Sequence, residues 1–206
     1  VTMNVVNYYN AATAMTVKPG ARKAGYRHYA FNTDEQQGAE SLQAVMAFLT
    51  ERYSNAATGL VSNWIIGNEV NNNNPWYYAG NYNVTAFTLE YEKAFRMFYT
   101  AIKSTNANAR VLTCIDQRWK DGTANQYGAK KFIDAFTVDV ASHGNIDWGV
   151  AWHPHPVPLT ASKFWDMPAS YKALHLIDHT ANTRMINPTN MDVFTTYMSQ
   201  PTYLSP

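Results

Sequence analysis

An acidic residue beside an amide, at the end of an apolar run, is the feature of this sequence that most clearly indicates acid–base chemistry. Residues 63–69 read Asn-Trp-Ile-Ile-Gly-Asn-Glu, so the apolar run leads directly into Asn68 and Glu69. Burial at an apolar rim and a second carboxylate nearby both raise the pKa of a carboxyl group, which suits it to donate a proton. The amide of Asn68 can hydrogen-bond a hydroxyl group without adding charge. We therefore predict that Glu69 is a general acid; the alternative is that it only closes the following turn.

Polar side chains follow two further apolar runs in the same way. The pair Asp116 and Gln117 comes after the run at 110–115, and the segment His-Pro-His-Pro at 153–156 comes after the run at 146–152. The carboxyl ends of neighbouring parallel strands meet at one edge of a sheet, where α/β proteins hold their ligands. We expect the three groups of polar residues to meet there, with Asp116 in a structural role.

Short β-rich runs alternate with amphipathic helical patterns along the chain. Strands are expected at residues 2–7, 61–67, 110–115 and 146–152. Helices are expected from Asp34 onward, across the apolar positions from 87 to 102, at 131–140 and near Asn190. The first helix is expected to start with a capping box of Thr33 and Gln36 and to bury an apolar stripe formed by Leu42, Val45, Met46 and Leu49. This alternation predicts an α/β fold with a parallel sheet and covering helices.

Four segments, at 29–32, 64–71, 115–119 and 152–156, together resemble the clan A glycoside hydrolases, which are (β/α)8 barrels. The resemblance is closest to an uncharacterised bacterial family of glycosidase-like proteins and extends over most of the chain. It implies that Glu69 is the general acid/base at the end of barrel strand four and that Asn68 binds the 2-hydroxyl of the sugar. It also implies a retaining O-glycosidase that needs no cofactor.

The resemblance leaves one catalytic group without a candidate. A retaining glycosidase needs a second carboxylate ~5–5.5 Å from the first, and in this clan it is a Glu after strand seven. No Glu follows Glu92 in this sequence, and Asp166, Asp178 and Asp192 do not end a recognisable strand. The chain has 206 residues, whereas a full barrel takes roughly 250. We therefore expect residues 1–206 to form a single, partial TIM-barrel domain whose nucleophile comes from outside it, with the remainder of the barrel as a partner.

Further residues are candidates for contacts with a saccharide. The imidazoles of His153 and His155 can bind hydroxyl groups, and Trp152 or Trp119 can offer a flat face to a pyranose ring. Gln117 is a candidate hydroxyl contact, and His28 and Asn32 are second-rank candidates on a loop that approaches the strand ends. The alternative for each tryptophan is packing in the core. Cys114 lies inside an apolar run and is expected to be a buried structural thiol.

The composition favours a neutral, hydroxyl-rich ligand. Lys and Arg number 16, Asp and Glu number 15, charged residues make up only 15%, and aromatic residues make up 14%. A near-neutral chain without a basic block argues against nucleic-acid binding by phosphate neutralisation. No apolar run approaches the ~20 residues that cross a bilayer, so no membrane partner is expected. The low charge and the saccharide substrate weakly favour a location outside the cytoplasm.

Two other classes of function remain open. The first is a non-catalytic carbohydrate-binding protein on a degenerate barrel, which the missing second Glu favours. The second is a metal-dependent hydrolase that uses His153 and His155 together with His175 and His179, which stand four residues apart. We favour the glycosidase and assign no metal ligand, because the metal interpretation leaves the third ligand and the base undefined.

Overall fold

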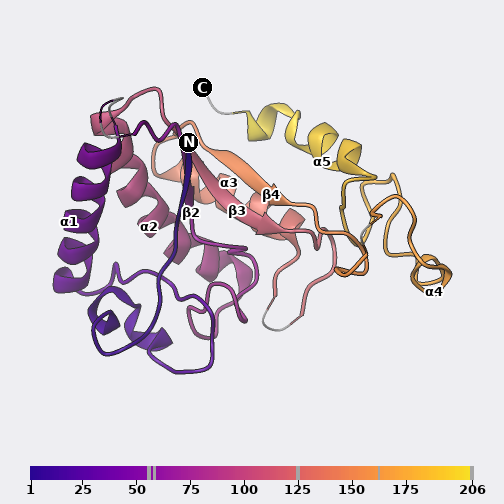
Figure 1. Ribbon diagram of the computed structural model, residues 1–206, viewed down its shortest axis with the longest axis horizontal. Helices are drawn as coiled ribbons and strands as arrows, with labels where there is room; N and C mark the ends of the chain where they lie inside the picture. The colour runs from indigo at the N-terminus through magenta and orange to yellow at the C-terminus, as the bar shows by residue number, and fades with distance from the viewer. Residues whose placement is uncertain (55–56, 58, 124–125, 162, 205–206) are drawn as a thin grey trace.

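One four-stranded parallel sheet organises the chain (Figure 1). The computed structural model describes residues 1–54, 57, 59–123, 126–161 and 163–204. The sheet order is β1-β2-β3-β4, the same as the order along the chain. Its strands are β1 (Thr2–Val5), β2 (Asn63–Ile66), β3 (Arg110–Asp116) and β4 (Gly149–His153). The predicted α/β fold with a parallel sheet is confirmed.

Three long helices connect successive strands and pack side by side (Figure 1). They are α1 (Gln36–Tyr53), α2 (Val84–Thr105) and α3 (Ala129–Ser142). The helix α2 lies between the other two and contacts both. The remaining helices are the short α4 (Ala169–Lys172), α5 (Met191–Met198) and the 3₁₀ turns η1 (Ala14–Thr16), η2 (Pro19–Ala21) and η3 (Pro201–Tyr203). No helix in the described part of the chain is long and apolar enough to cross a membrane.

The helix α2 shows why these residues fold as they do. Its buried residues include Tyr91, Phe95, Phe98 and Ile102, which recur every three or four residues and so share one face. The side chain of Asn83 caps its first turn by accepting a hydrogen bond from the backbone N–H of Ala86 at 2.9 Å. Burying each large apolar side chain contributes about 2 kcal/mol, so this face fixes α2 against the sheet.

The two faces of the sheet differ in burial. Along β2 the side chains of Trp64 and Ile66 are fully buried, whereas Asn63 and Ile65 are only partly buried. The row that contains Ile65 continues through its register partners Asn4 and Leu112, and Leu112 pairs in turn with Gly149. None of the four is buried. Parallel sheets normally have both faces covered, so this face is incompletely covered.

Several local predictions need correction. The helix α1 begins at Gln36 after an N-cap at Glu35 that makes no side-chain capping bond, so the predicted capping box at Thr33 is wrong. The carbonyl oxygen Oδ1 of Asn32 instead accepts from the backbone N–H groups of Asp34 and Glu35. Val45 was expected in the buried stripe but is 50% exposed. The buried residues of α1 are Gly38, Leu42, Met46 and Thr50, which recur every fourth position, so Val45 lies beside the buried stripe and not on it.

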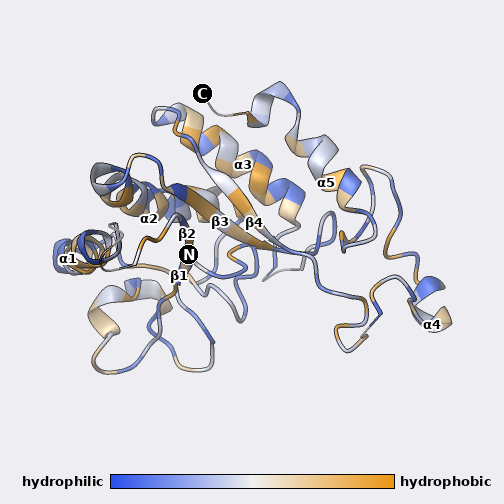
Figure 2. Cartoon of the chain, turned by 45° about the horizontal axis from the view of Figure 1, so that its top comes forward, coloured by the Kyte–Doolittle hydropathy of each residue, from blue (hydrophilic) through white to orange (hydrophobic). Residues whose placement is uncertain are grey.

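The chain after β4 is predicted to form a helix near Asn190. It makes a long excursion that contains only the short α4, and then returns through α5 (Figure 1). The ring of Phe194 on α5 packs against Trp152 of β4, with ring centroids 4.6 Å apart. In Figure 2 the apolar stretches of α3 and β4 lie close to α5. The expected short helix is therefore present, and it packs against β4, the edge strand of the sheet.

Candidate functional site

The carboxyl ends of β2 and β4 bring an acid and two imidazoles together. Glu69 follows β2, while His153 ends β4 and His155 follows it. The oxygen Oε1 of Glu69 lies 3.1 Å from Nδ1 of His153 and 2.9 Å from Nε2 of His155. Glu69 is only 7% exposed, whereas both histidines are half-buried. The predicted meeting of these strand ends is confirmed.

A sharp turn after β2 places the Glu69 side chain. Gly67 has a φ of 82°, and Glu69 itself has a φ of 43°, a left-handed conformation that is uncommon for residues other than glycine. The turn is held by β3, because the backbone N–H of Glu69 donates to Sγ of Cys114 at 3.2 Å and the N–H of Val70 donates to the Cys114 carbonyl at 2.8 Å. Strained backbone of this kind persists where surrounding contacts enforce it, often at functional sites.

Cys114 connects the turn to the histidines. Its buried Sγ lies 3.2 Å from Nε2 of His153, on the side of the ring opposite to Glu69. The prediction of a buried thiol is confirmed, but the contact with His153 was missed. The alternation of side chains along the strands could have predicted this contact. Cys114 pairs with Ala151 in the register of β3 and β4. It therefore lies on the same face of the sheet as His153, which is two residues after Ala151.

The electrostatics of this cluster differ from the prediction. Burial alone would raise the pKa of Glu69, but the hydrogen bonds and positive charge of His153 and His155 outweigh it, so the pKa is lowered. Contact with Cys114, and then with Glu69, raises the pKa of His153 to about 10 against the opposing effect of its burial. The expectation of a raised Glu69 pKa is therefore wrong. The free site favours a carboxylate beside an imidazolium.

Asp116, at the end of β3, is held by a buried asparagine that the sequence analysis did not single out. The amide of Asn71 donates to Oδ1 of Asp116 at 2.9 Å, and its carbonyl oxygen accepts the backbone N–H of Asp116 at 2.9 Å. The backbone N–H of Arg118 also donates to Oδ1 of Asp116 at 2.9 Å. Burial raises the pKa of Asp116 despite these hydrogen bonds. These contacts support the structural role expected for Asp116.

Comparison with known proteins assigns the chain to a family. The model of a family of unknown function, DUF5722, matches residues 1–206. The chain belongs to the DUF5722 family. Neither a curated protein nor a solved structure matches it.

Two of the predicted sugar-binding residues lie inside the core of this DUF5722 chain. Trp119 has no exposed surface, and its indole N–H donates to the carbonyl of Ala181 at 3.1 Å. Asn32 is also fully buried, and its amide donates to the carbonyl of Met15 and to Glu35. Neither side chain is accessible to a saccharide, so these two assignments are corrected. Both side chains hydrogen-bond other groups of the protein instead, because a buried polar group must find a partner.

The other predicted contact residues lie at or near the strand ends. Asn68 is half-buried, and its Oδ1 lies 4.0 Å from Sγ of Cys114. The ring of Trp152 packs on Phe194, which favours the packing alternative for this tryptophan. His28 packs edge-on against Tyr8 with centroids 5.0 Å apart, and burial lowers its pKa. Gln117 is half-buried, and in the described part of the chain its Oε1 has no hydrogen-bond partner.

The structure does not support the four-histidine metal interpretation. His179 pairs through Nδ1 with the carboxylate of Asp192, at 2.9 Å, on an exposed surface. His175 is exposed and has a φ of 46°. Within the described residues, the group of possible metal ligands that contains His153 and His155 is completed by Glu69 and includes neither of these two histidines.

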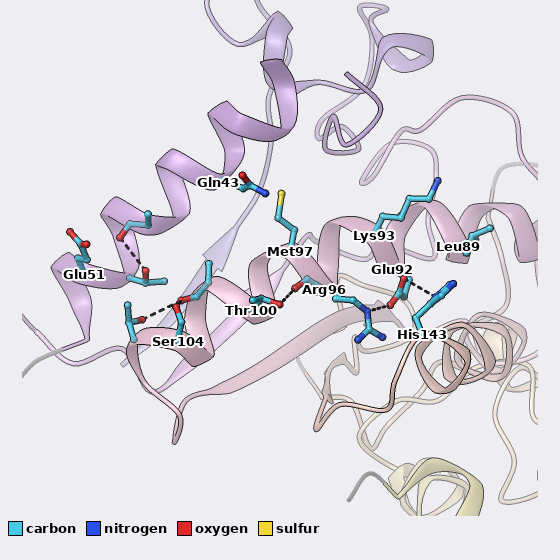
Figure 3. Close-up of a pocket in the computed structure, with 14 residues that line it drawn as sticks. Gln43, Glu51, Leu89, Glu92, Lys93, Arg96, Met97, Thr100, Ser104 and His143 are labelled. Atoms are coloured by element: carbon cyan, nitrogen blue, oxygen red, sulfur yellow. Dashed lines mark hydrogen bonds and ion pairs between the residues drawn. The ribbon is translucent and has the colours of Figure 1, made fainter. Parts of the chain in front are cut away.

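A cavity of about 990 Å³ lies away from the strand ends, between α1 and α2 (Figure 3). Its wall includes the buried Glu92, which contacts Arg96 at 2.5 Å and His143 at 3.3 Å. Arg96 also donates to the carbonyls of Val140 and Gly144 at the end of α3. These charges join α2 to α3, so we assign them a structural role. The candidate site remains the Glu69 cluster, because its groups converge on one oxygen atom.

Proposed function

We propose that this protein provides the proton-transfer part of an O-glycosidase that acts on an oligosaccharide or polysaccharide. The main support for this proposal is the position of Glu69, which is buried at the carboxyl edge of a parallel sheet. Two imidazoles, those of His153 and His155, contact the same oxygen atom of its carboxylate. Cleaving a glycosidic bond requires a proton to be given to the leaving oxygen. A proton is later removed from the attacking water. An imidazole nitrogen that is hydrogen-bonded to a carboxylate oxygen can exchange a proton with it, so the two groups suit both steps.

We further propose that the sheet is part of a (β/α)8 barrel. Four successive parallel strands joined through helices are what one half of such a barrel contains. The incompletely covered row of Asn4, Ile65, Leu112 and Gly149 occupies the face that points inward in a barrel. Further strands pairing with β1 and β4 would close the barrel and cover this face.

The proposal gives each residue at the strand ends a role. Because the pKa of His153 is raised and that of Glu69 is lowered, the imidazolium of His153 supplies the proton that Glu69 passes to the leaving oxygen. Glu69 then takes a proton from the attacking water, while Asn68 next to it binds the 2-hydroxyl of the sugar. His153 and His155 hold the Glu69 carboxylate and exchange its proton. The half-buried state of Asn68 and both histidines leaves them reachable by a ligand.

Retention of configuration requires a second carboxylate roughly 5–5.5 Å from the first. Asp116 is a poor candidate because Asn71 and Arg118 already hold its buried carboxylate. We therefore propose that the nucleophile comes from the strands that complete the barrel.

The experiment compares two substrates in the full-length protein. In Glu69→Gln, hydrolysis of a natural oligosaccharide should fall by about 10²–10⁴-fold, the usual contribution of general acid–base catalysis. Hydrolysis of an aryl glycoside with a good leaving group should fall far less, because such a group needs little protonation. The control is Glu51→Gln, which changes an exposed glutamate on α1. Equal losses on both substrates would assign Glu69 another role, and saccharide binding without hydrolysis that persists in Glu69→Ala would indicate a carbohydrate-binding protein.

A further inference from the structure

The cluster at the strand ends also has the composition of a metal site. Each of Glu69, His153 and His155 presents one ligand atom, and these three atoms lie within 4.8 Å of one another. Two imidazoles and one carboxylate are the protein ligands of many catalytic zinc sites, which keep the fourth coordination position open. The ligand types and their number therefore suit a borderline divalent cation.

The spacing of the ligand atoms fits an ion of this size. Zinc binds nitrogen and oxygen ligands at about 2.0–2.2 Å in tetrahedral geometry, which separates neighbouring ligand atoms by roughly 3.3 Å. The Oε1 atom of Glu69 lies 3.1 Å from Nδ1 of His153 and 2.9 Å from Nε2 of His155. These two separations are about 0.2–0.4 Å shorter than the tetrahedral value, and all three ligand atoms lie within 4.8 Å of one another.

The second ring nitrogen of His153 is already held. A metal-binding histidine usually has its other ring N–H donated to a fixed partner, which selects the tautomer and orients the ring. Here Nε2 of His153 lies 3.2 Å from the buried Sγ of Cys114. A proton on Nε2 donated to this sulfur leaves Nδ1 free to bind the ion. Cys114 thus orients the His153 ring from the side opposite to the ion.

The backbone between the two histidines limits their movement. Pro154 and Pro156 follow His153 and His155 directly. Proline fixes its own φ and restricts the residue before it to extended conformations. The backbone N–H of His155 also donates to the carbonyl of His153 at 3.0 Å. Both imidazoles are therefore presented to Glu69 by a stiff segment, which lowers the entropy lost when an ion binds.

We propose that Glu69, His153 and His155 form a binding site for a divalent first-row transition metal, with Zn²⁺ as the best match. Binding occupies the same Glu69 oxygen that faces the two imidazoles. The ion and proton transfer by Glu69 therefore exclude each other, so Zn²⁺ inhibits hydrolysis. This inhibitory effect rests on the proposed function, whereas the binding site itself does not.

The binding test uses the full-length protein freed of metal by a chelator and titrated with Zn²⁺ in a calorimeter. One Zn²⁺ should bind per chain. Loss of an outer-shell partner typically weakens metal binding by 10–100-fold, and His155→Ala, which removes a ligand, should weaken it by more than this. The control is His179→Ala, which removes an exposed histidine paired with Asp192 and should leave the affinity unchanged. Absence of binding, or equal affinity in the two variants, would overturn the site; circular dichroism verifies that both variants are folded.

Activity measurements separate this inference from the proposed function. Inhibition by Zn²⁺ that a chelator reverses would support both. Binding of Zn²⁺ together with hydrolysis that requires it would keep the metal site and reject proton transfer by Glu69. No Zn²⁺ binding, combined with the substrate-dependent loss expected for Glu69→Gln, would reject the metal site and keep the glycosidase.

Discussion

Nε2 of His153 lies 3.2 Å from Sγ of Cys114, so a thiol buried in β3 holds the imidazole at the end of β4. The other nitrogen of the ring faces Glu69 at 3.1 Å. One imidazole therefore connects β3 with the turn after β2. This relationship fixes the side of the ring that the Glu69 carboxylate meets.

Replacing Cys114 should lower the pKa of His153. The thiol contributes most to raising that pKa to about 10, so Cys114→Ala should move it toward the ordinary value near 6.5. Cys114→Ser keeps a polar atom at this position and should move it less. An NMR titration of the imidazole resonances measures both shifts, and an unchanged pKa in Cys114→Ala would contradict the prediction.

The same contact predicts how stability depends on pH. A histidine with a raised folded pKa contributes stability that is present below its unfolded pKa and is lost as the pH rises through the folded value. The contribution of His153 should therefore be complete below about pH 6.5 and disappear as the pH rises through about 10. In Cys114→Ala this loss should be complete at a lower pH. Urea unfolding across this range compares the variant with the wild type.

Gly67 should tolerate a methyl group less well than another glycine with similar backbone. Gly67 has a φ of 82° and Gly144 a φ of 91°, but a Cβ at Gly67 would lie 2.4 Å from Cγ1 of Val70, whereas Gly144 faces open space. Both alanine variants carry a conformational penalty of about 1 kcal/mol or more. Gly67→Ala should cost a further 1–3 kcal/mol from overpacking, as a rough range. Thermal unfolding measures the difference, and equal losses would show that Val70 moves aside freely.

Asn71 should contribute more to stability than its neighbour. Asn71→Ala removes two hydrogen bonds with Asp116 and a third, at 3.0 Å, to the carbonyl of Tyr127. The buried carboxylate of Asp116 then loses a donor, so we expect a loss of about 3 kcal/mol. The matched control is Asn72→Ala, because Asn72 is also buried but its Oδ1 has no hydrogen-bond partner within the described residues. A control variant as unstable as Asn71→Ala would show that burial rather than hydrogen bonding matters.

Trp119 should matter for stability and not for saccharide affinity. Trp119→Phe loses the hydrogen bond to Ala181 and part of a fully buried ring, for which we expect about 2 kcal/mol. Trp165→Phe changes a side chain that is 65% exposed and should alter stability by at most about 0.5 kcal/mol. Denaturant unfolding and saccharide titration measure both properties. A folded Trp119→Phe with much weaker saccharide binding would restore its predicted role.

The sequence determined the local elements and the edge of the sheet at which the polar groups meet. Apolar periodicity identified the three long helices and four strands because it reflects burial on one face. It also placed Glu69 and the two histidines after strands, and parallel strands must bring such positions to one edge. These predictions used only spacing and the direction of the chain.

Tertiary structure alone decided which atoms touch and how they share charge. The pKa of Glu69 depends on two imidazoles that follow it by 84 and 86 positions, and no local pattern contains their orientation. The burial of Asn32 and Trp119 likewise depends on partners at Met15 and Ala181. Side-chain direction is set by packing between segments that are remote in sequence, and burial determines whether a polar group binds a ligand or its own protein.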